Sequence, residues 1–365
     1  MASITTSFRQ NTIAYVDLKQ PVQPQLVNEH RDAEYLKLDN VNEDADWGLV
    51  NDHFKSVKEL YMDGGWDEEL HDDKVPPHWP LEKITLSGAC DLKACRSRWI
   101  TKGLVKHLVL YYPCHLLVEN LKLAELDKDE HILPEKYHGK MIKWTAAEED
   151  PRFDWEQHMP YKPKLEILEI SENDARDTIF IWASSSPHLL RRLRTLSLIA
   201  WNGCDLWYTP GEGLELVLPH LTNLETLVIG LDDIYKDAKQ LAQIFDALPP
   251  NIHTLRFRGS RSLARDDADH YQKWINKFDD PAFLPKLKTL SFILDLEDRH
   301  AHEGRDIEQI EGPPVTTAEA KRATERFCQA AERRGVKVEP FFGSWTESFT
   351  LALDRTPIDP EWNSA

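Results

Sequence analysis

The chain has 365 residues, of which 62 are acidic and 44 are basic, so its formal net charge at pH 7 is −18. This charge opposes binding to nucleic acids and to anionic membranes, and it favours encounters with basic or neutral polar partners. Acidity also keeps a large surface in solution, so the charge alone identifies no partner.

The chain shows no targeting or membrane signal. Residues 1–9 lack the apolar core of a signal peptide, and no run approaches the roughly 20 apolar residues that cross a bilayer. The cysteines are odd in number and show no disulfide or metal spacing: Cys90, Cys95, Cys114, Cys204 and Cys328. We therefore expect a cytoplasmic or nuclear protein.

In chain order, residues 1–30 are polar, contain Pro21 and Pro24, and are expected to form an N-terminal extension. A phrase, apolar-x-x-Leu-x-apolar, then recurs along the chain. Its central apolar residues are Leu36, Leu60, Ile84, Leu108, Leu168, Leu196, Leu227, Leu255 and Leu290. The alternation predicts a strand with one buried face, and the repetition predicts a solenoid in which each turn contributes one strand.

The segments between the phrases are expected to return the chain to the sheet as irregular helices. Helical patterns with inward apolar residues cover residues 174–183, about 232–248 and about 266–278. Proline, which blocks helix continuation, precedes several strands: Pro80, Pro163, Pro219, Pro250 and Pro285. The sequence therefore predicts one solenoid domain over residues 31–345.

Three places break this rhythm. An insert at about 126–163 carries aromatic residues, including Trp144 and Trp155, that either anchor a partner or pack on the flank of the solenoid. Residues 297–315 form an acidic stretch that is predicted to be a mobile loop. A helix that is capped at Thr316 or Thr317 and ended by Gly335 is expected to close the stack, with a last strand near Val336 and a tail at 346–365.

These features resemble leucine-rich-repeat proteins, in particular the degenerate repeats of fungal F-box-type proteins. The likeness is clearest in the phrases Leu218–Leu227 and Leu284–Leu290. It implies an α/β horseshoe with a parallel concave sheet and a role in binding proteins. The family's helical F-box, which docks the adaptor of a cullin ubiquitin ligase, is not recognisable here. A ligase substrate-recognition subunit with a lost or cryptic F-box is therefore the alternative.

No pattern in the sequence supports catalysis, a metal or a cofactor. Phosphate-loop, dinucleotide-binding and nucleophile-elbow motifs are missing, and His300 and His302 fall in the acidic stretch. We therefore predict a non-enzymatic interaction protein. An enzyme or small-molecule-binding protein with a pocket beneath the 126–163 insert is the further alternative.

The partner-binding residues are predicted from the strand positions that point away from the core and from the aromatic insert. The candidates are Tyr61, Asp63, Tyr111, Trp144, Trp155, Trp201, Arg256 and Arg258. The two arginines share one strand face and would grip an anionic group, or else would neutralise nearby Asp266, Asp267 or Asp269.

Overall fold

The computed structural model describes residues 13–26, 30–42, 44–64, 70–89, 91–111, 163–171, 175–185, 187–199, 214–230, 238–265, 269–296 and 315–340. Contacts within the chain divide it into two compact units. Unit 1 holds the described residues up to Tyr111 together with 163–165, and unit 2 holds those from Glu166 to 340. Each unit is a solenoid-like α/β stack in which neighbouring strands run parallel.

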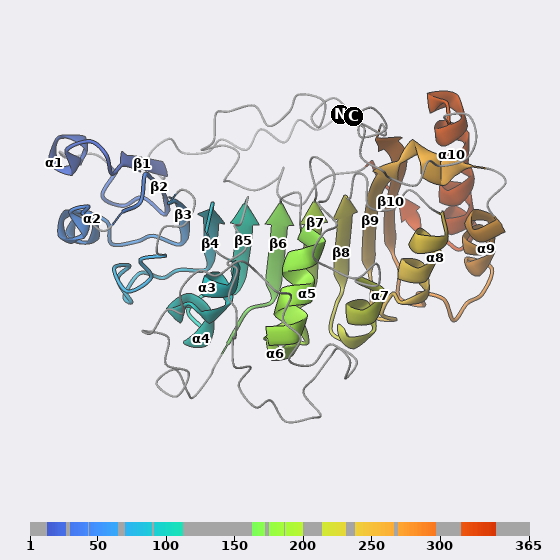
Figure 1. The fold of residues 1–365 in the computed structure, drawn as a ribbon, viewed down its shortest axis with the longest axis horizontal. Coiled ribbons are helices and arrows are strands. Elements are labelled where there is room, and N and C mark those ends of the chain that lie inside the picture. The colour runs from blue at the N-terminus through green and yellow to red at the C-terminus, as the bar shows by residue number, and fades with distance from the viewer. Residues whose placement is uncertain are drawn as a thin grey trace, which may run out of the picture. The chain divides into compact units, whose positions relative to one another are not determined.

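Unit 1 places its strands side by side in chain order (Figure 1). The described strands are β1 (Ile13–Asp17), β2 (Tyr35–Asp39), β3 (Glu59–Asp63), β4 (Lys83–Ser87) and β5 (His107–Tyr111). The described helices are α1 (Val22–Gln25), α2 (Trp47–His53), α3 (Asp91–Arg96) and α4 (Arg98–Thr101). The four strands that the phrase predicts here are confirmed. The phrase missed β1, because Ala14 takes the place that Leu36 holds in the next strand.

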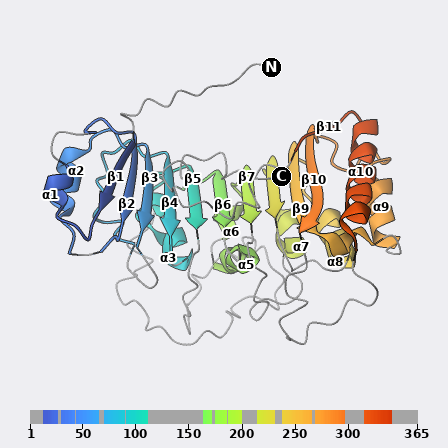
Figure 2. The same cartoon turned by 90° about the horizontal axis from the view of Figure 1, so that it is seen from above.

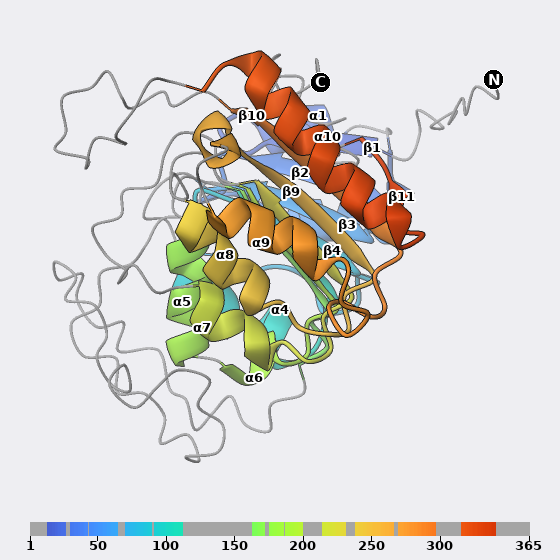
Figure 3. The ribbon, with the colours of Figure 1, turned by 90° about the vertical axis from the view of Figure 1, so that its right-hand side faces the viewer.

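Unit 2 repeats the arrangement with longer return helices. Its strands are β6 (Ile167–Ser171), β7 (Thr195–Ile199), β8 (Thr226–Gly230), β9 (Thr254–Ser260), β10 (Thr289–Leu296) and β11 (Lys337–Val338). Its helices are α5 (Ala175–Ser185), α6 (Pro187–Leu190), α7 (Leu214–Val217), α8 (Ala238–Asp246), α9 (Asp269–Lys277) and α10 (Thr317–Arg333), with 3-10 turns at Leu218–His220 and Arg261–Ala264. Figure 3 shows α5, α7, α8 and α9 gathered on one face of these strands, as return segments of a solenoid require.

Successive turns are joined by one recurring backbone arrangement. At the start of β3, β4, β5, β7, β8, β9 and β10, two consecutive N–H groups donate to a single carbonyl of the previous turn. In unit 1 the N–H groups of Lys58 and Glu59 donate to Glu34 at 2.7 and 3.0 Å. In unit 2 Glu225 and Thr226 donate to the Arg194 carbonyl in the same way, at 2.8 and 2.9 Å. The ladder satisfies the backbone groups that each incoming loop would otherwise leave unpaired.

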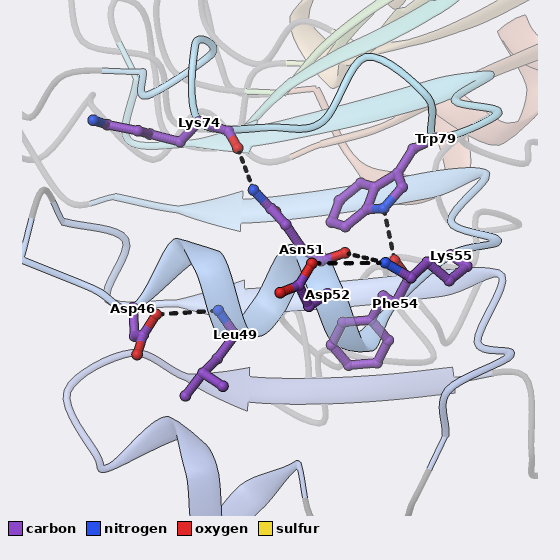
Figure 4. Close-up of polar contacts among 8 residues, drawn as sticks. All are labelled: Asp46, Leu49, Asn51, Asp52, Phe54, Lys55, Lys74 and Trp79. Carbon is purple, nitrogen blue, oxygen red and sulfur yellow. Dashed lines mark hydrogen bonds and ion pairs between the residues drawn. The ribbon is translucent and has the colours of Figure 1, made fainter.

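Side chains of the return segments add further ties between turns. In Figure 4 the Asn51 side-chain amide donates to the carbonyl of Lys74, one turn later, at 2.8 Å. The indole N–H of Trp79 donates back to the Phe54 carbonyl at 2.9 Å, and Asp46 caps α2 by accepting the N–H of Leu49. These bonds fix the spacing of the turns on the side of the stack that carries α2.

The C-terminal end of unit 2 is closed as the sequence predicts. Thr316 and Glu319 form a capping box at the start of α10, and Gly335 follows its end at a φ of 79°. Helix α10 lies beside β10 (Figure 2), and β11 pairs with β10. The buried ring of Phe327 stacks on Phe292, with ring centroids 4.0 Å apart. The helix therefore covers the apolar edge that the last turn would leave in water.

Candidate functional site

The strand face of unit 1 that points away from the leucine core carries a row of aromatic and cationic side chains. Tyr15, Lys37 and Tyr61 occupy the same register position of β1, β2 and β3. The Lys37 ammonium lies 4.7 Å from the centroid of the Tyr61 ring and 6.0 Å from that of Tyr15. This spacing is that of a cation–π contact, so the row holds a cation between two aromatic rings.

A row of carboxylates runs beside these rings, because β1, β2 and β3 each end in aspartate: Asp17, Asp39 and Asp63. The Tyr15 hydroxyl donates to Asp39 Oδ2 at 2.6 Å, and Lys37 Nζ lies 3.5 Å from Asp39 Oδ1. We call these six residues the β1–β3 face. With three carboxylates and one ammonium, its formal charge is −2.

The side chain of Asn40 helps to hold the carboxylate row. Asn40 follows β2 in the left-handed region, with a φ of 55°, which asparagine tolerates better than most residues. Its side-chain amide donates to Asp17 Oδ1 at 2.8 Å. The N–H of Lys19 donates to the same oxygen at 2.9 Å. The carboxylate of Asp17 is therefore fixed in position before any partner arrives.

The hydrogen bond to Asp39 and the negative charge of the face raise the pKa of Tyr15, the tyrosine on β1. The pKa of Tyr15 is raised to about 12, from an ordinary value of 10.0, and the largest cause is the hydrogen bond to Asp39. Burial and the negative charges of Asp39, Asp17 and Asp63 account for the rest of this rise. All three carboxylates thus make the electrostatic potential at the Tyr15 hydroxyl more negative.

The rings of this face differ in how far solvent reaches them. Tyr15 is 54% exposed, whereas Tyr61 is only 5% exposed and Lys37 is buried. Among the described residues the exposed large hydrophobic side chains are Tyr15 and Leu49, the second of which lies on α2 and is 38% exposed. Tyr15 is therefore the ring that the strand face offers to a partner.

The sequence predicted part of this site. Tyr61 and Asp63 do lie together on the β1–β3 face, with Tyr61 beneath Lys37 and largely covered. Tyr111 is half-buried at the end of β5, beside Ser87 in the register. Tyr15 and Asp17 were missed because β1 was missed. The signal that finds them is the final aspartate shared by β1, β2 and β3.

The strand face of unit 2 carries a partly buried ion pair between Arg258 and Asp295. Arg258 is 6% exposed, and its guanidinium donates to Asp295 through Nε at 2.8 Å and Nη2 at 3.0 Å. Asp295 is thus one carboxylate partner of Arg258, and of the three nearby aspartates that the sequence suggested, Asp266 and Asp267 lie outside the described residues. Arg256, two residues earlier on β9, is half-buried. The pair of Arg258 and Asp295 therefore joins β9 to β10.

The middle row of the same strand face is polar and largely buried. Glu169, Ser197, Val228, Arg256 and Ser291 lie side by side in the register of β6 to β10. Within the described residues, the hydroxyls of Ser197 and Ser291 are buried without a hydrogen-bond partner. Neighbouring side chains in such a row are only about 4.8 Å apart and shield one another. This row therefore offers less accessible surface than the β1–β3 face.

Several predicted residues lie outside the described part of the chain: Trp144, Trp155 and Trp201, with the aromatic insert, His300 and His302. In the described segments, no group of three or more His, Cys, Asp and Glu side chains is placed to hold a metal ion. None of the helices within those segments is long and apolar enough to cross a membrane.

The chain was also compared with known proteins. No model of a protein family matches it, and a search of curated proteins found no match.

Proposed function

We propose that this chain is a non-enzymatic protein–protein interaction module of the leucine-rich-repeat type, and that it binds a partner on the β1–β3 face. The repeat phrase, its strand register and the helical return segments support the assignment to this repeat class. A regular face of neighbouring strands in a repeat protein provides an extended surface that can bind another protein.

The observation that carries the proposal is the exposed ring of Tyr15. Its hydroxyl is already hydrogen-bonded to Asp39, so the side chain has little freedom left to lose on binding. Tyrosine is among the residues that dominate the binding energy of protein interfaces, because it buries a large area at low entropic cost. Tyr15 is therefore the expected anchor.

Two other functions remain predictions: substrate recognition for a cullin ubiquitin ligase, and small-molecule binding beneath the 126–163 insert. No described residue bears on either of them. In unit 2 the candidate Arg258 is buried and paired with Asp295, so it is less accessible to a partner than Tyr15.

The proposal is tested by capturing partners with three forms of the full-length chain: the wild type, Tyr15→Ser and Leu49→Ser. The last variant is a matched control, because Leu49 is also a large exposed hydrophobic residue of unit 1 but lies on a return helix. We expect a partner that the wild type and Leu49→Ser capture equally and that Tyr15→Ser loses. Quantitative mass spectrometry of the three eluates, repeated with the purified partner, measures this. Equal capture by all three forms would contradict the proposed site.

A further inference from the structure

We infer that the β1–β3 face recognises an extended basic segment of its partner, in which arginine side chains two residues apart contact the carboxylates of Asp17, Asp39 and Asp63 while Tyr15 packs against their stems. This inference rests on the proposed function and specifies the partner's chemistry. It comes from charge complementarity together with the aromatic row, because a group of carboxylates alone would select no particular ligand.

The first observation is that the face already holds one cation. Lys37 lies between the rings of Tyr15 and Tyr61 and against Asp39, on the same strands that carry the carboxylates. A basic side chain of the partner would meet a similar combination at Tyr15: an exposed aromatic ring that is hydrogen-bonded to the carboxylate of Asp39. Arginine suits this place better than lysine, because its planar guanidinium stacks on rings and pairs with carboxylates through two hydrogen bonds.

The second observation is the formal charge of −2 on the six residues of the face, which hold three carboxylates and one ammonium. Asp39 receives both the Tyr15 hydroxyl and the Lys37 ammonium. Asp17 receives only neutral donors in the described contacts, namely the amide of Asn40 and the backbone N–H of Lys19. A hydrogen bond from a neutral donor leaves the full negative charge in place. The face would therefore repel an anionic segment and attract a cationic one.

The third observation is the spacing of the carboxylates. They end neighbouring parallel strands, which lie about 4.8 Å apart, so the row from the first to the third aspartate spans roughly 9.6 Å. In an extended segment that crosses these strands, side chains at alternate positions lie about 6.6 Å apart on one side. Two such arginines fit within the row, each near the gap between two carboxylates.

The test uses the full-length chain and fluorescent peptides of 11 residues in a Gly/Ser background, with arginine at three alternate positions. Matched peptides carry glutamate or glutamine at those positions. Binding is followed by fluorescence anisotropy at low and high salt. We expect the arginine peptide to bind, the glutamate peptide not to bind, and high salt to weaken the arginine complex.

The variants separate the carboxylate row from the general charge of the chain. The triple variant Asp17→Asn, Asp39→Asn, Asp63→Asn should weaken arginine-peptide binding about tenfold. Its control is Asp32→Asn, Asp52→Asn, Asp73→Asn, which changes the net charge equally at exposed positions of the same unit and should leave binding unchanged. Lys37→Gln should strengthen binding, because it removes a competing cation; damage to the fold would not have this effect.

Two results would overturn the inference: equal binding of the arginine, glutamine and glutamate peptides up to about 1 mM, or equal weakening by the two triple variants. The proposed function is judged separately. If a partner depends on Tyr15 but binds the Asp17, Asp39 and Asp63 triple variant normally, the basic-segment inference fails and the interaction module stands. If no partner depends on Tyr15, both fail.

Discussion

The ion pair between Arg258 and Asp295 is expected to contribute to the stability of unit 2. Asp295→Ala leaves the buried guanidinium without the carboxylate to which it donates two hydrogen bonds. Removing one partner of a buried pair costs about 3–5 kcal/mol. The side chain of Asp295 is 26% exposed, against 8% for Arg258, so the lower end of that range, about 3 kcal/mol, is expected.

Urea unfolding, followed by circular dichroism, measures this loss. With a denaturant dependence of about 3 kcal/mol per molar, the unit 2 transition should fall by roughly 1 M. The double variant Arg258→Met, Asp295→Leu should recover most of the loss, because a buried pair replaced by apolar side chains of similar volume is often close to neutral. Binding on the β1–β3 face should be unchanged in both variants.

An exposed pair in the same unit provides the control. Arg194 Nη2 lies 2.7 Å from Glu225 Oε1, and these side chains are 55% and 37% exposed. Solvent screens this pair, so Glu225→Ala should shift the urea midpoint much less than Asp295→Ala. Equal shifts for the two alanine variants would refute the distinction between the pairs. If Asp295→Ala kept its stability but lost partner capture, the result would indicate that Arg258 takes part in binding.

Two further predictions concern the two ends of the fold. Phe327→Ala should lower the free energy of unfolding by about 3–5 kcal/mol, because the ring is fully buried against Phe292. Gln329→Ala, on the exposed side of α10, should have little effect. Urea unfolding of both variants measures this, and equal losses would contradict the capping role of α10. In an alkaline titration followed at 295 nm, the difference between the wild type and Tyr15→Phe should be the ionisation of one tyrosine near pH 12. In Asp39→Asn this ionisation should move toward pH 10. Because the pKa of Tyr15 is raised on folding, its hydrogen bond stabilises the fold fully below about pH 10 and is lost as the pH rises toward 12. A Tyr15 that ionises near 10 in the wild type would refute the bond.

The strands could be predicted because their signal is local and repeated. Leu60 and Ile84 are paired neighbours in the register, and each must fill the same volume of the core in its own turn. The requirement therefore recurs in the sequence at the spacing of the turns. The closing helix could be predicted for a similar reason, since the cap at Thr316 and the stop at Gly335 are short-range signals.

The contents of the candidate site follow different physics, which is why only part of it could be predicted. Which carboxylate neutralises Arg258 depends on the pairing of β9 with β10, across 37 residues of sequence, and nearby Asp266 and Asp267 are equally good partners by composition. Whether Tyr61 or Tyr15 exposes its ring to a partner depends partly on where the Lys37 side chain lies, and no pattern within one strand encodes that.

The repeat determines which positions share a face. The end of the stack determines which of them stays exposed, because Tyr15 has a paired strand on one side only, among the described strands. We therefore expect the binding anchor on β1, and the titration of Tyr15 and the paired serine variants both test this placement.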